Sequence, residues 1–406
     1  MNNVILNTGL NIFELLSYFS CELVLIVGII LNVVLIPLII NNPKFKRISD
    51  LITCISFCLN SIILTFMVFQ SEFFSIKEDL IVFNTSTLLL KLFINLFSLF
   101  FVIATYKFTR KTRHKVPLIN SILILIVLLS GLLLTSDNFA LVYILLEGIV
   151  VLIYKYASNM HPNKTNMYSP VFIAISFSAT ALFVTFYFMD FVVQDLLQKS
   201  IMQSCMSLAL LLKIGLFPVY NYSIDKKCRN NIAYTILIFC FLPFVGAVAF
   251  NKIISLCMFN EVCQMCTAIF VIICALSATL YAYKIKNITG FLINVAQLYT
   301  CFYISNSIFT KDMNPKFMFA AITVLLILFA MLRLYKNNKK LTTIFSLILI
   351  LNAFLIPLFG LDILYNIYTY DKTGFLAINA FIFCNMLVII KTLLIAEGFY
   401  KTNNNS

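Results

Sequence analysis

Residues 139–156, FALVYILLEGIVVLIYKY, are apolar over nearly their whole length and carry one carboxylate, Glu147, near the middle. An apolar run of about 18 residues is long enough to cross the roughly 30 Å hydrocarbon core of a bilayer as an α-helix. This stretch therefore predicts a transmembrane helix with an ionisable group at membrane depth.

Stretches of the same kind recur from one end of the chain to the other. Of the 406 residues, 62% are hydrophobic and 11% are charged, whereas a soluble domain has about 25% charged residues. A transmembrane barrel would instead show alternating segments of about 10 residues, which this sequence lacks. The predicted fold is an all-α polytopic membrane protein of about 13 transmembrane helices, spanning 17–40, 51–69, 80–105, 117–135, 139–156, 168–189, 200–220, 232–251, 262–282, 288–309, 317–334, 341–366 and 375–396.

The charges alternate between successive loops. The net charge is +13, and the basic residues gather in the odd-numbered loops while most acidic residues lie in the even-numbered ones. This asymmetry predicts an amino terminus outside and a carboxyl terminus in the cytoplasm, in a bacterial inner membrane or its organellar equivalent. The excess of base is thus explained by topology, and no nucleic-acid partner is expected. The polar amino terminus lacks a basic leader, so the first span is interpreted as a retained helix.

Two prolines interrupt predicted helices at matching places. Pro218 lies in the seventh helix and Pro357 in the twelfth, where a missing N–H and a ring clash break a helix. Broken helices at corresponding positions of two halves are typical of inverted-repeat ion transporters. The predicted organisation is a three-helix region, two inverted five-helix repeats and a cytoplasmic tail, at residues 1–110, 117–252, 259–396 and 397–406.

Five ionisable residues fall inside predicted spans: Glu22, Lys91, Glu147, Lys213 and Lys391. Such a group costs about 2.5–3.5 kcal/mol at mid-bilayer and needs a partner or a wet cavity. Glu147 and Lys213 lie deep, which favours function over structure. Glu22 lies near a helix end, where a snorkelling side chain or a structural ion pair is the simpler interpretation.

The sequence shows no pattern for a bound cofactor. A Gly-rich phosphate loop, a cysteine cluster and a haem-ligand pattern are all missing. Cys263 and Cys266 form a CxxC, but the chain has two histidines in all, so a metal site is not expected. Other cysteines within spans are interpreted as small apolar side chains.

Two motifs resemble one family. The stretch LLKIGLFPVYNYSID, 211–225, resembles the helix-7 motif of the antiporter-like proton-translocating membrane subunits of respiratory NADH:quinone oxidoreductase. The residues that match this motif are Lys213, Gly215, Pro218 and Asp225. The stretch SDNFALVYILLEGI, 136–149, resembles the family's helix-5 motif, with Glu147 at the essential Glu.

Weaker likeness extends over residues 80–396. NTSTLLLKLF, 84–93, looks like helix 3 of the N-type subunit, with Lys91 at its Lys, and KNITGFLINVAQL is similar to the helix 9–10 junction. Two relay lysines of the family are missing. Pro243 stands at the lysine of helix 8, and the lysine of helix 12 falls within 361–364, where Asp362 is the ionisable residue.

The resemblance implies a Glu–Lys pair that couples events in the membrane arm to proton movement. At ~7 Å and an effective dielectric near 20, opposite charges attract by about 2.4 kcal/mol, and separating them favours release of the lysine proton. Glu147, Lys213 and Lys91 are the expected relay, with Lys391 as a substitute for a missing lysine. Expected partners are the bilayer and the other membrane subunits of a respiratory complex, whose redox centres would supply the energy.

Three alternatives stay open on the sequence. A subunit of a multi-subunit cation/proton antiporter shares both motifs. A non-pumping assembly subunit would explain the missing lysines. A secondary transporter of small solutes is less favoured, because an organic substrate would favour additional polar or aromatic groups around the broken helices and the chain has no Trp.

Overall fold

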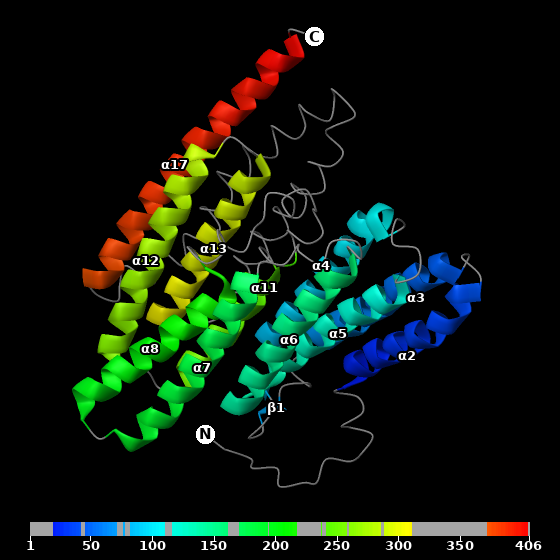
Figure 1. Ribbon diagram of the computed structural model, residues 1–406, viewed down its shortest axis with the longest axis horizontal. Helices are drawn as coiled ribbons and strands as arrows, with labels where there is room; N and C mark the ends of the chain where they lie inside the picture. The colour runs from blue at the N-terminus through cyan, green and yellow to red at the C-terminus, as the bar shows by residue number, and fades with distance from the viewer. Residues whose placement is uncertain are drawn as a thin grey trace. The chain divides into compact units, whose positions relative to one another are not determined.

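The computed structural model describes residues 19–41, 45–70, 76–77, 82–109, 116–160, 170–193, 195–216, 237, 241–257, 260–285, 288–310 and 372–404. Within these ranges the chain is helical except for its connections and one small hairpin (Figure 1). The hairpin pairs β1 (Ile76–Lys77) with β2 (Val82–Phe83) in antiparallel register. These two-residue strands depart from the all-helical expectation without changing the fold class.

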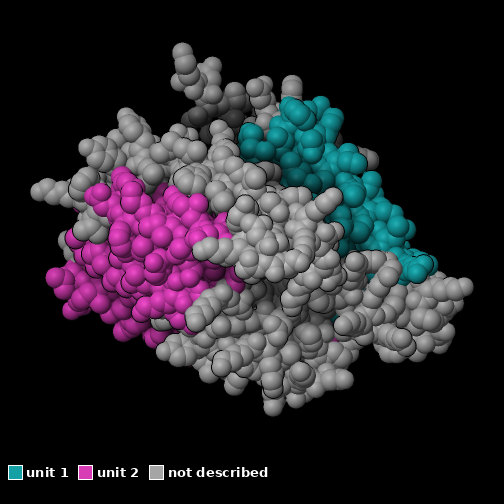
Figure 2. Space-filling model, turned by 90° about the horizontal axis from the view of Figure 1, so that it is seen from above, with its two compact units in different colours: residues 1–135 teal, residues 136–406 magenta. Residues whose placement is uncertain are grey.

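The chain divides into two compact units, residues 1–135 and 136–406, coloured separately in Figure 2. The helices of the first unit are α2 (Ser20–Asn41), α3 (Phe45–Phe69), α4 (Thr85–Thr109) and α5 (Val116–Thr135). Those described in the second unit are α6 (Phe139–Met160), α7 (Pro170–Val192), α8 (Leu196–Ile214), α11 (Leu242–Cys257), α12 (Glu261–Lys284), α13 (Ile288–Thr310) and α17 (Lys372–Asn404).

The first unit is a bundle with polar groups inside and large apolar side chains outside. Helix α3 contacts α2, α4 and α5. The side chains of Ile30 and Val34 on α2 and of Ile62 on α3 are 55–65% exposed, as expected for a surface covered by lipid. Between the helices, Asn32 donates to Thr53 Oγ1 at 3.2 Å. Such interhelical hydrogen bonds hold membrane helices together where lipid provides no hydrophobic driving force.

The second unit is arranged around α13. This helix is buried from Gly290 to Ile308 and contacts α11, α12 and α17. Helix α8 contacts α7, α11 and α12. Helices α6, α7 and α8 supply the candidate site, and α11 packs against both α6 and α8.

Most predicted spans coincide with helices, and seven described helices are long and apolar enough to cross a membrane. Several spans differ from the described helices at their ends; for example, α3 begins at Phe45 and α4 at Thr85. The span predicted at 200–220 ends as α8 at Ile214, because Gly215 adopts the left-handed conformation (φ 80°). Of the span predicted at 232–251, the structure describes residue 237 and residues 241–251; α11 runs from Leu242 to Cys257, with Pro243 in its first turn, where a missing N–H is tolerated.

The remaining predictions concern residues outside the described ranges, the domain boundaries and the carboxyl-terminal tail. The spans at 317–334 and 341–366, with Pro357, lie outside the described residues, as does Pro218. The division after Thr135 groups α5 with α2–α4, whereas the first repeat was predicted to begin at residue 117; the inverted repeats stay a prediction. Helix α17 continues through Asn404, into the predicted tail.

Candidate functional site

The first part of the site is the amino-terminal half of α6. Asn138 precedes the helix, and its Oδ1 accepts from the backbone N–H of Leu141 at 3.2 Å, which caps the first turn. Glu147 lies two and a half turns further along the same helix. The turn that resembles the family motif at residues 136–138 therefore determines where α6 begins, and so the depth of the carboxylate.

The second part is the carboxyl end of α8, which places Lys213 in the last helical turn. The N–H groups of Gly215 and Leu216 donate to the carbonyls of Leu212 and Leu211, at 3.1 and 3.4 Å. This pair of bonds is a Schellman ending, which favours Gly in the left-handed position. The partial negative charge at a helix carboxyl end also stabilises a nearby ammonium.

Helix α11 fixes the position of that helix end. A Cβ added at Gly246 would lie 2.5 Å from Ile214 Cγ1 and 3.0 Å from its Cγ2, closer than real side chains approach. The absence of a side chain at Gly246 therefore allows α11 to pack directly on the residue that follows Lys213.

Glu147, Thr180 and Lys213 meet at the centre of the site. Lys213 Nζ forms an ion pair with Glu147 Oε1 and donates to Thr180 Oγ1 at 2.7 Å. Thr180 Oγ1 in turn donates to Glu147 Oε1 at 2.6 Å and lies 3.0 Å from the Ser176 carbonyl. The structure thus brings together the two predicted residues from α6 and α8, and α7 adds a hydroxyl that bridges them.

The charges of Glu147 and Lys213 lie in direct contact, closer than the ~7 Å expected from the sequence. Opposite charges at about 4 Å and an effective dielectric near 20 attract by about 4 kcal/mol. The carboxylate therefore stabilises the ammonium more strongly than expected, and a larger perturbation is needed to separate them.

Aromatic rings form one wall of the site. Tyr143, one turn before Glu147 on α6, presents its ring to Lys213 Nζ at 5.3 Å from the centroid, a cation–π contact. Phe183 of α7 stacks on this ring with centroids 4.4 Å apart. These contacts hold the ammonium on the side of α6 and α7.

The two charges differ in their access to the surroundings. The Lys213 side chain is 1% exposed, whereas that of Glu147 is 29% exposed. Glu147 is therefore the more accessible member of the pair, and Lys213 is enclosed by protein.

The other predicted site residues lie elsewhere. Lys91 forms a buried ion pair with Glu22 inside the first unit. Lys391 on α17 places its ammonium 5.6 Å from the ring centroid of Tyr283, in the last turn of α12.

Sequence reasoning missed two residues of this region. Thr180 is one of several hydroxyl residues on α7, and its position against Glu147 depends on how α7 packs on α8. Lys252 on α11 is 7% exposed and donates to the backbone carbonyl of Ser136 at 2.5 Å. In the sequence, Lys252 is a lysine at the end of an apolar helix. Such a lysine usually lies at the membrane interface, so it does not stand out as a site residue.

No model of a known protein family matches the sequence, and no curated protein matches it. Among solved structures, a chain of respiratory complex I from Thermus thermophilus with bound aureothin aligns with a TM-score of 0.69 and 11% identity, over 93% of this chain and 96% of that one. A chain of the Mrp complex from Dietzia sp. DQ12-45-1b aligns with a TM-score of 0.67 and 10% identity, over 93% and 79%. A chain of the membrane-bound sulfane sulfur reductase, an archaeal respiratory membrane complex, aligns with a TM-score of 0.62 and 10% identity, over 91% and 86%. At these identities the likeness establishes the fold.

Proposed function

We propose that this chain is a divergent proton-translocating membrane subunit of a complex of the NADH:quinone oxidoreductase type. The observation that carries the proposal is the group of Glu147, Thr180 and the fully buried Lys213, in a fold shared with chains of respiratory and Mrp complexes. The chain itself would carry no redox centre, and partner subunits would supply the energy.

Thr180 gives a proton a path between the two charges. Its hydroxyl accepts from Lys213 and donates to Glu147. If Lys213 passes a proton to the hydroxyl oxygen while the hydroxyl proton moves to Glu147, the result is a neutral amine and a carboxylic acid. Burial favours such a neutral pair when the surroundings no longer support two charges. Glu147, as the more exposed partner, would then exchange the proton.

Polar side chains on α13 support a wet interior in the second unit. Gln297 is fully buried, and neither its amide oxygen nor its amide nitrogen has a hydrogen-bond partner in the described part of the chain. An unsatisfied buried polar group costs about 1–3 kcal/mol, which internal water would recover. In this proposal α13 continues the proton path where Pro243 replaces the lysine of helix 8.

The principal pair of the proposed relay is Glu147 and Lys213. Lys391 has an anchoring role instead. Its contact with Tyr283 at the end of α12 suits an ammonium that anchors α17 near the membrane surface. The proposed orientation, with the amino terminus outside and the carboxyl terminus in the cytoplasm, rests on the loop charges.

A subunit of a multi-subunit cation/proton antiporter is the second candidate, supported by the fold match to the Mrp chain. Affinity purification of the tagged chain from native membranes separates them. Copurifying flavin- and iron–sulfur-containing subunits support the first, and copurifying antiporter subunits without redox centres support the second.

A non-pumping assembly subunit is the third candidate, because Pro243 replaces a relay lysine. Proton flux measured on the purified complex in sealed vesicles distinguishes this case. If the wild-type complex and variants that lack the Glu147–Lys213 pair pump equally well, the chain has a scaffolding role.

A further inference from the structure

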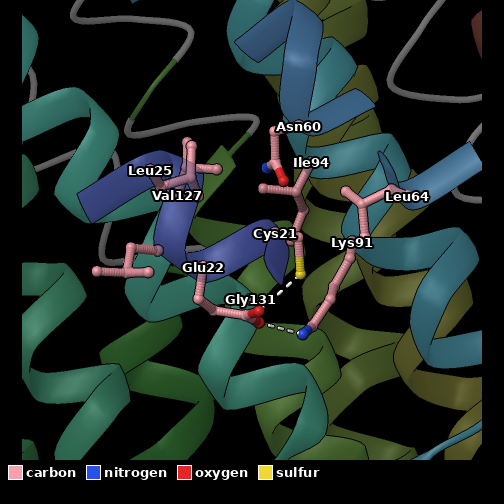
Figure 3. Close-up of a pocket in the computed structure, with 10 residues that line it drawn as sticks. Cys21, Glu22, Leu25, Asn60, Leu64, Lys91, Ile94, Val127 and Gly131 are labelled. Carbon is pink, nitrogen blue, oxygen red and sulfur yellow. Dashed lines mark hydrogen bonds and ion pairs between the residues drawn. The ribbon is translucent and has the colours of Figure 1, made fainter. Parts of the chain in front are cut away.

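The first unit contains a second buried ion pair beside a small cavity (Figure 3). Glu22 of α2 accepts from Lys91 of α4 through Oε1, and from the Cys21 thiol through Oε2 at 2.6 Å. The side chains of Lys91 and Glu22 are 3% and 7% exposed. All three residues line the cavity, together with Asn60 of α3, Gly131 of α5 and aliphatic side chains.

The cavity has the size of a single water site. The space open to the centres of water molecules is about 20 Å³, and one bound water needs about 10–15 Å³ on the same measure. Internal water also needs polar partners. The cavity offers a carboxylate, an ammonium and an amide, so it differs from the apolar voids that stay dry.

Asn60 supplies the observation that points to a ligand. Its side chain is 3% exposed, and its Oδ1 has no hydrogen-bond partner among the described residues. Its Nδ2 donates to Asn95 Oδ1 at 2.9 Å, and Asn95 Nδ2 donates to Ser61 Oγ at 2.6 Å. The amide oxygen of Asn60 is therefore the open end of a row of polar groups, and Asn60 is among the residues that line the same cavity as the ion pair.

We propose that this cavity binds one water molecule, which joins the Glu22–Lys91 pair to the row formed by Asn60 and Asn95. The water donates one hydrogen to Asn60 Oδ1 and the other to a carboxylate oxygen of Glu22, which satisfies the buried amide oxygen. The first unit then has a hydrated ion pair of its own, separate from the pair on α6 and α8.

This water gives Glu22 a proton donor. A proton that reaches the water forms hydronium; one O–H bond of the hydronium breaks as a new O–H bond forms at a Glu22 oxygen, and the water is regenerated. The titratable groups that line the cavity are Cys21, Glu22 and Lys91. Outside the lining, α3 carries Lys46, Arg47, Asp50, Cys54 and Cys58, α4 carries Tyr106 and Lys107, and α5 has no ionisable side chain.

Difference infrared spectroscopy on the full-length protein in lipid vesicles tests the proposal, with pH steps applied in ordinary water and in water enriched in oxygen-18. Gly131→Ala fills the cavity without removing a polar group, because its Cβ would lie 3.8 Å from Lys91 Cε. Asn60→Leu removes the amide. Ser130→Ala is the matched control, since Ser130 lies next to Gly131 on α5 but bonds to its own helix at Ile126.

We expect an isotope-sensitive band of internal water in the wild type and in Ser130→Ala, and its loss in Gly131→Ala and in Asn60→Leu. A carboxylic-acid band that disappears in Glu22→Gln should change frequency in the same two variants. A wild type without the water band, or a water band unchanged in both cavity variants, overturns the proposal. A higher melting temperature of Gly131→Ala with no spectral change would show that the cavity is dry.

Discussion

Replacing Thr180 by Val removes the bridging hydroxyl and keeps the shape of the side chain. The substitution deletes the hydrogen bond from Lys213 at 2.7 Å and the bond to Glu147 at 2.6 Å. A hydrogen bond to a charged group contributes about 1.5–3 kcal/mol. If one such bond is needed when the proton moves, its loss slows transfer roughly ten- to a hundred-fold. Thr180→Ser keeps the hydroxyl and should retain most of the rate.

The assay is proton uptake into vesicles that contain the purified complex, measured with a pH-sensitive dye and normalised to redox turnover. Thr185→Val is the control on the same helix, because Thr185 bonds to its own helix at Ala181. A Thr180→Val variant that translocates protons as fast as Thr185→Val would refute the bridging role.

Three further substitutions test the position of the α8 end and the role of Lys391. Gly246→Ala places a Cβ against Ile214 and should lower the free energy of unfolding by about 1–3 kcal/mol, which thermal unfolding measures. If adding Ile214→Ala to this variant does not restore the melting temperature, the contact is contradicted. Gly215→Ala forces an L side chain into a left-handed position (φ 80°), at a cost of about 1–2 kcal/mol, so a variant as stable as wild type in the same experiment would disprove the Schellman ending. Lys391→Met removes the contact with Tyr283 and should change proton flux less than twofold, whereas a tenfold loss would make Lys391 part of the relay.

The sequence predicted the parts of this site that depend on one helix at a time. Apolar runs located most described helices, and the charges of Glu147 and Lys213 stood out because an ionisable side chain in such a run is costly. Such local signals do not depend on how the helices pack.

The features that sequence reasoning missed depend on helix packing. The bridge through Thr180 requires a particular rotation of α7, and nothing distinguishes this threonine from Thr185 in the sequence. A structural ion pair is one of the two interpretations that the sequence offers for Glu22, but its partner, Lys91, lies 69 positions away and cannot be identified without the packing of α2 on α4. The sequence predicts that this helix extends to residue 220 with a break at Pro218, whereas α8 ends at Ile214 and is capped by Gly215.

The central claim is that protons pass through the ion pair on α6 and α8. Its most direct test is proton translocation by the reconstituted complex carrying Lys213→Ala or Glu147→Gln, with the amount of inserted protein measured in the same vesicles. The account predicts normal insertion and no coupled proton flux in either variant. Undiminished flux in both variants would contradict it.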